Sequence, residues 1–260
     1  MRKIITQSDI EKSLLEIGLN EGQTCFLHCD TMLLALMGSD SVENKLKTLV
    51  ESFQNILGEN GTLIVPTFTY SFCEGKSYNP QTSKVNESQF GIFPNYILSR
   101  NDFVRTMDPI FSVAIWGKDK AYFQDLNLES SFGEGTIFHK LHLKNAKIVC
   151  LGCSLDRVTF VHYVEQLNKV DYRYIKSFNG QIIIDGKPVD KNVDYYVRDL
   201  NKDLELNLSK FKKYLEDKGL LHSSAIGRIG IMSVFAEDFF SSGSEFLQQD
   251  PYGFVQEQNV

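Results

Sequence analysis

Apolar residues recur along the chain at two spacings, one typical of amphipathic helices and the other of buried strands. Helical spacing joins Ile10, Leu14 and Ile17 after a capping-box pattern at 8–11, and it recurs as a single stripe over 41–57. Continuous apolar runs predict buried strands at 24–28, 62–69, 111–116 and 147–152. Strands and helices therefore alternate through the first two thirds of the chain.

The last third adds hairpin signals to this alternation. A strand at 181–189 contains an Asp185-Gly186 turn, a further strand is expected at 195–198, and an amphipathic helix at 208–220. Residues 70–90 are polar and aperiodic, which is typical of a functional or mobile loop. The pattern predicts an α/β fold with a mixed sheet covered by helices, formed by one domain over 1–260 in which 180–260 could form a C-terminal subregion.

Composition narrows the classes of protein to consider. The 260 residues are 42% hydrophobic and 23% charged, the profile of a globular protein, with a net charge of −6 and no Lys/Arg run to neutralise phosphates of a nucleic acid. No apolar segment reaches the 18 or so residues of a membrane helix, and no signal peptide is evident at the N-terminus. Five cysteines, an odd number, favour free thiols and a cytoplasmic location.

The segment from Gly152 to Glu165 holds the strongest candidate chemistry. A buried strand ends, the chain turns, and the first turns of the following helix carry Thr159, His162 and Glu165. A spacing of three places these side chains on one helical face, where a carboxylate can orient an imidazole and raise its basicity. Such a pair suits a general base, but a half-buried histidine satisfied by its helical neighbour is equally compatible with the spacing.

This segment is similar to the Thr-x-x-His-x-x-Glu signature of the aminoglycoside 3-N-acetyltransferase family. Five further segments match that family in the same order along the chain. They are His28-Cys29-Asp30-Thr31, 61–69 (Gly-Thr-Leu-Ile-Val-Pro-Thr-Phe-Thr), 105–112 (Arg-Thr-Met-Asp-Pro-Ile-Phe-Ser), Ser131-Phe132-Gly133 and Tyr172-Arg173-Tyr174. The similarity runs from about residue 22 to Asp250-Pro251.

The resemblance implies a three-layer α/β/α fold that binds acetyl-CoA or another acyl-CoA in a cleft. It also implies direct attack of a substrate amine on the thioester, with His162 as the base, Glu165 orienting it and Thr159 lining the site. No metal is implied. The residues that match the family's acyl-CoA contacts are Asp30, Thr31, Met32, Ser112 and Phe132.

The acceptor is expected to be an amino sugar. The chain departs from the antibiotic-modifying members at Cys29-Asp30 and Asp108-Pro109, and these changes are interpreted as a shift in the acceptor. Candidate acceptor contacts are Tyr70, Lys84, Arg105, Asp108 and Arg173. The basic residues among them could neutralise a pyrophosphate, which favours a nucleotide-linked amino sugar of surface-glycan biosynthesis. The alternative acceptor is an aminoglycoside, with antibiotic resistance as the outcome.

Two further classes of protein stay open. A cysteine hydrolase would use Cys29 or Cys153 as nucleophile with His162 as base, and a silent binding protein would retain the sugar-nucleotide site without chemistry. The Cys150-Leu151-Gly152-Cys153 motif lacks two further ligands for zinc and is interpreted as a pair of buried structural thiols. The expected partners are small molecules and not nucleic acid or membrane, and a homo-oligomer stays open.

Overall fold

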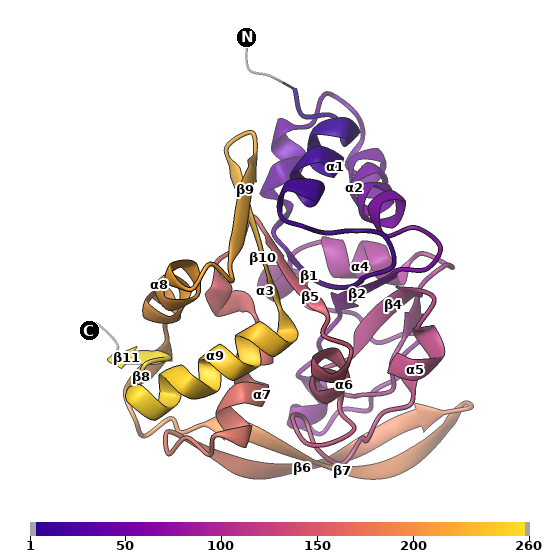
Figure 1. The fold of residues 1–260 in the computed structure, drawn as a ribbon. Coiled ribbons are helices and arrows are strands. Elements are labelled where there is room, and N and C mark those ends of the chain that lie inside the picture. Colours follow the sequence, from indigo (N-terminus) through magenta and orange to yellow (C-terminus); the bar gives the residue numbers. More distant parts are fainter. Residues whose placement is uncertain (1–3, 258–260) are drawn as a thin grey trace.

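Seven strands form a mixed sheet at the centre of the computed structural model, which describes residues 4–257 (Figure 1). In spatial order they are β3 (Val104–Arg105), β4 (Val113–Gly117), β2 (Thr62–Pro66), β1 (Thr24–Cys29), β5 (Lys147–Leu151), β10 (Ile229–Phe235) and β9 (His222–Ile226). Strand β1 runs parallel to both β2 and β5, whereas the other neighbouring pairs are antiparallel. The predicted mixed sheet is confirmed.

Helices cover both faces of this sheet (Figure 1). One face is covered by α1 (Gln7–Glu16), α2 (Val42–Leu57) and α4 (Phe93–Leu98). The other face is covered by α5 (Lys120–Gln124), α6 (Ile137–Leu143), α7 (Phe160–Leu167), α8 (Ser209–Asp217) and α9 (Ala236–Gln249). The result is the three-layer α/β/α arrangement that the sequence led us to expect.

The two hydrophobic cores follow from the twofold alternation of side chains along each strand. On β5, Ile148 and Cys150 pack into the core beneath α6, α7 and α9, whereas Val149 and Leu151 pack into the core beneath α1 and α2. All five residues of β5 are buried, so the strand appears in the sequence as a continuous apolar run.

Shorter elements surround the three layers. Two separate two-stranded sheets pair β6 (Arg173–Ile184) with β7 (Lys187–Arg198), and β8 (Leu204–Leu206) with β11 (Val255–Glu257). The remaining elements are α3 (Glu87–Phe90) and the 3-10 turns η1 (Thr31–Leu36), η2 (Ser71–Glu74) and η3 (Leu155–Arg157). The β6–β7 hairpin extends as a long arm along the lower edge of the molecule (Figure 1).

Several element boundaries differ from the sequence prediction. The capping box of α1 consists of Thr6 and Asp9, not of residues 8–11, because the Asp9 carboxylate accepts the Thr6 N–H at 3.0 Å. The helix expected after the buried strand at 147–152 is divided into η3 and α7, because Val158 is extended and the Asp156 carboxylate accepts the Leu208 N–H at 2.6 Å.

The two strands expected at 181–189 and 195–198 are parts of one long hairpin. Asp185 and Gly186 both adopt positive φ angles, 48° and 75°, as a two-residue type I′ turn requires. The ladder from this turn continues without interruption to the pair Arg173 and Arg198. No helix within residues 4–257 has the length and apolar character needed to cross a membrane.

Asp108 occupies the buried turn between β3 and β4. Its side chain is 3% exposed, and one carboxylate oxygen accepts the N–H groups of Ile110 at 2.9 Å and Phe111 at 2.8 Å. Burial nevertheless raises the pKa of Asp108 to about 6 from the usual 3.8, since two hydrogen bonds do not replace the lost hydration. The carboxyl group is therefore more easily ionised in the unfolded chain than in the folded protein.

Asp108→Asn is expected to increase stability at neutral pH, because the amide oxygen keeps the two acceptor contacts without a buried charge. Because folding raises the pKa of Asp108, the contribution of Asp108 to the free energy of unfolding is fully present below about pH 4. This contribution is lost as the pH rises to about 6. Above pH 6 the variant should be more stable by up to about 3 kcal/mol. Urea denaturation of both proteins from pH 4 to pH 8 measures the difference, and a difference that does not change with pH would contradict the assignment.

Candidate active site

One cavity lies where the chain leaves β1 and β5 for helices on opposite faces of the sheet. After β1 the chain passes to α2 on one face, and after β5 it passes to α7 on the other. Parallel strands whose connections diverge in this way leave a crevice at their carboxyl ends. This first cavity has a volume of about 490 Å³.

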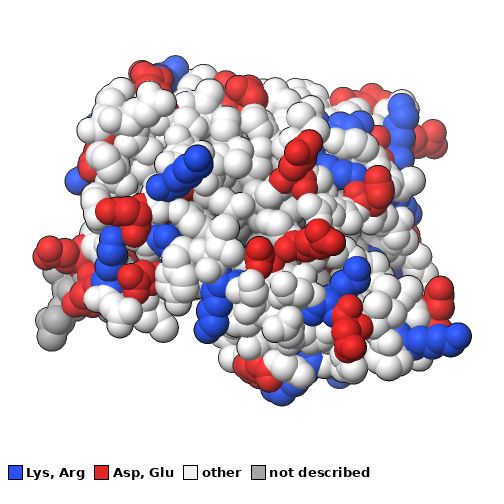
Figure 2. Space-filling view, turned by 90° about the horizontal axis from the view of Figure 1, so that it is seen from below, with Lys and Arg blue, Asp and Glu red and all other residues white. Residues whose placement is uncertain are grey.

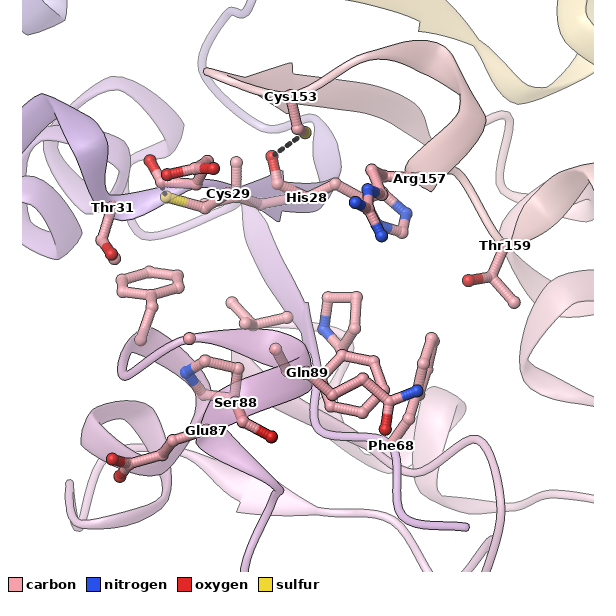
Figure 3. Close-up of a pocket in the computed structure, with 18 of the residues that line it drawn as sticks. His28, Cys29, Thr31, Phe68, Glu87, Ser88, Gln89, Cys153, Arg157 and Thr159 are labelled. Atoms are coloured by element: carbon pink, nitrogen blue, oxygen red, sulfur yellow. Dashed lines mark hydrogen bonds between the residues drawn. The ribbon is translucent and has the colours of Figure 1, made fainter. Parts of the chain in front are cut away.

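Two facing walls enclose the first cavity (Figure 3). One wall carries His28, Cys29 and Thr31 from the end of β1, with Cys153 and Arg157 from the segment after β5. Phe68 and the α3 region from Glu87 to Gly91 form the facing wall. Thr159, the residue before α7, projects into the cavity at its end.

A second cavity of about 240 Å³ contains the side chain of His162, one helical turn after Thr159. Its other lining residues come from the β6–β7 hairpin and from the β8–β11 sheet. They are Tyr172, Arg173, Tyr195, Arg198, Leu204, Leu206 and Val255. Helix α7 thus begins at the first cavity and carries the imidazole into the second.

A buried carboxylate holds His162 in place. Glu165 is fully buried, and its Oε2 lies 2.6 Å from Nδ1 of His162 and 2.6 Å from Nε of Arg173. The contact with Arg173 is an ion pair by distance, although the Nε–H group of Arg173 lacks the geometry of a hydrogen bond. No described side chain bonds to Nε2 of His162, whose side chain is 17% exposed, so this nitrogen is available to a bound molecule.

Arg173 changes the protonation expected for His162. Burial and the Arg173 charge lower the pKa of His162, and together they outweigh the opposing effect of Glu165. The pKa of Glu165 is also lowered: burial raises it, but His162 and Arg173 more than compensate. Glu165 does raise the pKa of His162, as the sequence led us to expect, but burial and Arg173 outweigh this effect. At neutral pH the site holds a neutral imidazole oriented by a carboxylate, which can accept a proton.

An aromatic cluster lies between the two cavities. Tyr70 from the first cavity packs on Phe111 at 6.1 Å, and Tyr195 from the second packs on the same ring at 5.1 Å. Phe132 stacks on Phe111 at 4.9 Å and meets the His162 ring edge-on at 5.7 Å. The cavities therefore border one shared aromatic cluster, which reaches the His162 ring through Phe132.

The residues expected to contact acyl-CoA lie in three different settings. Asp30 and Thr31 line the first cavity, and the Asp30 carboxylate accepts the Met32 N–H at 2.9 Å. Met32 is 61% exposed and lines neither cavity. Ser112 and Phe132 are fully buried outside both cavities, Ser112 donating to the Thr67 carbonyl at 2.7 Å.

The residues expected to contact the acceptor do not converge either. Tyr70 lines the first cavity and Arg173 the second. Lys84 is exposed and Asp108 is buried, and both lie outside the two cavities. Arg105 is also outside them, donating to the Thr67 carbonyl at 2.6 Å and to the Ser112 hydroxyl at 3.2 Å.

Sequence reasoning missed Tyr195 and Arg198, which line the second cavity. Arg157, which points into the first cavity (Figure 3), was considered from the sequence only as one of several cations that could neutralise a pyrophosphate. Tyr195 and Arg198 reach the site only through the hairpin register that pairs Arg173 with Arg198, which no local pattern reveals.

The cysteine-hydrolase alternative finds no nucleophile beside His162. Cys29 and Cys153 line the first cavity, where Cys153 contacts the His28 carbonyl at 3.5 Å and Cys29 contacts the Asp30 carbonyl at 3.6 Å. His162 instead pairs with Glu165 and lines the second cavity. Within residues 4–257, no three His, Cys, Asp or Glu side chains are grouped to hold a metal ion.

Charges of both signs lie around the site. The first cavity has Asp30, Glu87 and Asp156 beside Arg157, and the second has Arg173 and Arg198. On the face of the molecule seen in Figure 2, acidic and basic side chains are interspersed and neither sign extends across the whole face.

The chain matches the family described as "Aminoglycoside 3-N-acetyltransferase" over residues 34–248. A relative from Bacillus subtilis, the SPbeta prophage-derived aminoglycoside N(3')-acetyltransferase-like protein YokD, is 23% identical and aligns with 88% of this chain and 89% of its own length. Aminoglycoside N(3)-acetyltransferase IV from Salmonella sp is 21% identical, with 96% of this chain and 90% of the relative aligned.

Solved structures share the fold. The aminoglycoside acetyltransferase AAC-IIIb in its binary complex with CoASH superposes with a TM-score of 0.81 at 17% identity, covering 95% of this chain and 97% of that one. A mutant of AAC(3)-IVa in complex with a gentamicin gives a TM-score of 0.77 at 21% identity, covering 98% and 92%.

We predict that the imidazole of His162 titrates below the usual 6.5, which histidine NMR titration can measure. Arg173→Met should raise the pKa of His162 by removing a cation, and Glu165→Gln should lower it further by removing an anion.

Arg173→Lys is the matched control, because it keeps the positive charge while changing its geometry. Its His162 pKa should stay closer to that of the wild type than the pKa in Arg173→Met does. The NMR signal of His162 is assigned as the histidine signal that is absent from the spectrum of His162→Asn. A His162 pKa above 6.5 in the wild type, or opposite shifts in the two charge-removing variants, would contradict the proposed electrostatics.

Proposed function

The chain belongs to the aminoglycoside 3-N-acetyltransferase family, and from this premise we propose that it transfers the acetyl group of acetyl-CoA to a primary amine of an aminoglycoside. The observation that carries the proposal is the array of His162, Glu165 and Arg173, which presents a neutral, oriented imidazole in a cavity beside a second, larger one. The family match and the relatives named as aminoglycoside N(3)-acetyltransferases support this acceptor over the nucleotide-linked sugar that the sequence favoured.

Acetyl-CoA would occupy the first cavity. The AAC-IIIb relative of this fold is described with CoASH, which supports CoA as the donor. Arg157 supplies a cation to that cavity for an anionic group of the donor, and the apolar wall around Phe68 suits the pantetheine arm. The thioester would lie toward Thr159 and the aromatic cluster.

The acceptor amine would enter the second cavity and transfer its proton to Nε2 of His162. A protonated amine has no lone pair, so this transfer must precede or accompany attack on the thioester carbon. The new C–N bond forms as the C–S bond breaks, and the CoA thiolate departs and takes up a proton. Glu165 stabilises the imidazolium, while burial and the Arg173 charge disfavour protonation of the imidazole before the amine arrives.

His162→Asn is expected to lower kcat/KM for acetyl transfer by about 10²- to 10⁴-fold, the usual contribution of a general base. The matched control is His222→Asn, because His222 is exposed on β9 and lines neither cavity. Product formation is measured by mass spectrometry, with circular dichroism to confirm folding. Wild-type activity in a folded His162→Asn protein would refute the assignment of the base.

A nucleotide-linked amino sugar remains a second candidate acceptor because of one specific observation. The cavity that contains His162 is lined by Arg173 and Arg198, and its described lining includes no carboxylate. Arg173 is neutralised by Glu165, so Arg198 is the cation that would decide between a polycationic and an anionic acceptor.

Acetyl-CoA turnover with separate panels of aminoglycosides and nucleotide amino sugars tests the acceptor, and we expect turnover with aminoglycosides. Arg198→Gln should lower or leave unchanged the KM for an aminoglycoside, because it removes like-charge repulsion. For an anionic nucleotide sugar the same change should raise KM about tenfold or more, through loss of a charge-assisted hydrogen bond.

The control for that experiment is Arg228→Gln, which removes the same charge from an exposed position outside both cavities. Turnover with nucleotide sugars alone would reverse the proposed acceptor. Absence of acetyl transfer to every amine in both panels would refute the reaction class.

A further inference from the structure

Three of the five cysteines gather at the carboxyl ends of β1 and β5, beside the first cavity, and catalysis as proposed uses none of them. Cys150 lies on β5, with Cys153 directly after it and Cys29 at the end of β1. They are neither paired as disulfides nor part of a metal-binding group within residues 4–257.

The sheet separates these thiols into a pair and a single residue. Cys150 and Cys153 both belong to the core on the α7 side of the sheet, whereas Cys29 packs on the α2 side. Gly152, with φ of 71°, turns the chain back after β5, and the thiols of Cys150 and Cys153 lie close enough for each to shift the pKa of the other. The turn thus brings together two sulfur atoms that an extended chain would hold apart.

The two partners differ in access. Cys150 is 1% exposed and does not line the cavity, whereas Cys153 lines it and contacts the carbonyl of His28 (Figure 3). A reagent that enters the first cavity therefore reaches Cys153 and not Cys150, which is buried behind Cys153.

We propose that Cys150 and Cys153 form a redox-active dithiol at the first cavity, in which Cys153 reacts with a low-molecular-weight disulfide and Cys150 then closes an internal disulfide. In the first step the Cys153 thiolate attacks one sulfur of the reagent, the reagent's S–S bond breaks, and one thiolate leaves. In the second step the Cys150 thiolate attacks the Cys153 sulfur and releases the second thiol. Both cysteines together are oxidised by two electrons, which reduce the added disulfide to two thiols.

The electrostatics of the pair agree with this order of attack. The interaction with Cys150 is the main cause that lowers the pKa of Cys153, and it outweighs burial and the Asp30 charge, with a further contribution from Arg157. The same interaction and burial raise the pKa of Cys150, and burial likewise raises that of Cys29. A thiolate is the attacking species, so Cys153 is the member of the three best prepared to begin the exchange.

The test uses the full chain, reduced and freed of reductant, with oxidised glutathione in one arm and the disulfide of CoA in the other. Trypsin then releases residues 148–157, a peptide that contains Cys150 and Cys153 and none of the other cysteines. With at least one reagent we expect this peptide to become lighter by two hydrogen atoms. A faster reaction with the CoA disulfide would identify the donor's own oxidised form as the source, an identification that rests on the proposed function.

Two variants resolve the order of the steps. Cys150→Ser should accumulate the mixed disulfide on Cys153, and Cys153→Ser should form neither species in that peptide. The control Cys73→Ser, on η2 outside both cavities, should behave as the wild type does.

Reaction of Cys29 in place of Cys153, a crosslink between Cys29 and Cys153, or no change with either reagent would overturn the proposal. If a variant does not fold, brief alkylation of the native reduced wild type still decides, because Cys153 should react at least about tenfold faster than Cys150 or Cys29. None of these readouts needs acetyl transfer, so failure of the dithiol and failure of the proposed enzyme are distinguishable.

Discussion

The buried carboxylate of Glu165 organises the site, because its negative charge must be paired with positively charged or hydrogen-bonding groups. A carboxylate without exposure is strongly disfavoured unless it is paired, and Glu165 has Arg173 and His162 on the same oxygen. The guanidinium stays charged at all relevant pH values, so it supplies the compensating charge and the imidazole is free to stay neutral. Glu165 consequently orients His162 without converting it to the cation that could not accept a proton.

The same ion pair connects two parts of the chain that form the second cavity. Glu165 lies on α7 and Arg173 begins β6, so the pair fixes the start of the hairpin against the helix. The hairpin register then places Arg198 opposite Arg173, and the Tyr196 hydroxyl donates to the Val170 carbonyl at 2.5 Å in the connecting turn. The position of His162 and the shape of the second cavity are thus set by one set of contacts.

The sequence was most informative where the deciding contacts are local. His162 and Glu165 lie one helical turn apart, so their pairing could be predicted, as could the α2 stripe and the hairpin turn at Asp185. The partnership of Glu165 with Arg173 could not be predicted, because Arg173 reaches Glu165 from another element. Burial and this arginine together lower the His162 pKa despite Glu165. Arg105 likewise resembled a free cation in the sequence, yet the approach of β2 and β4 surrounds it with the backbone of Thr67 and the hydroxyl of Ser112.

The location of the first cavity follows from the topology of the sheet more than from any single residue. Strand β1 lies between two parallel neighbours, and the connections after β1 and β5 leave toward opposite faces, so no helix covers the edge between them. Residues that end these strands must line the opening whatever their side chains, which is why His28, Cys29 and Cys153 meet there. The architecture determines where these residues lie, whereas their side-chain chemistry is particular to this chain. Helix α7 starts at the same edge, with Thr159 at this opening, and places His162 in the second cavity one turn later.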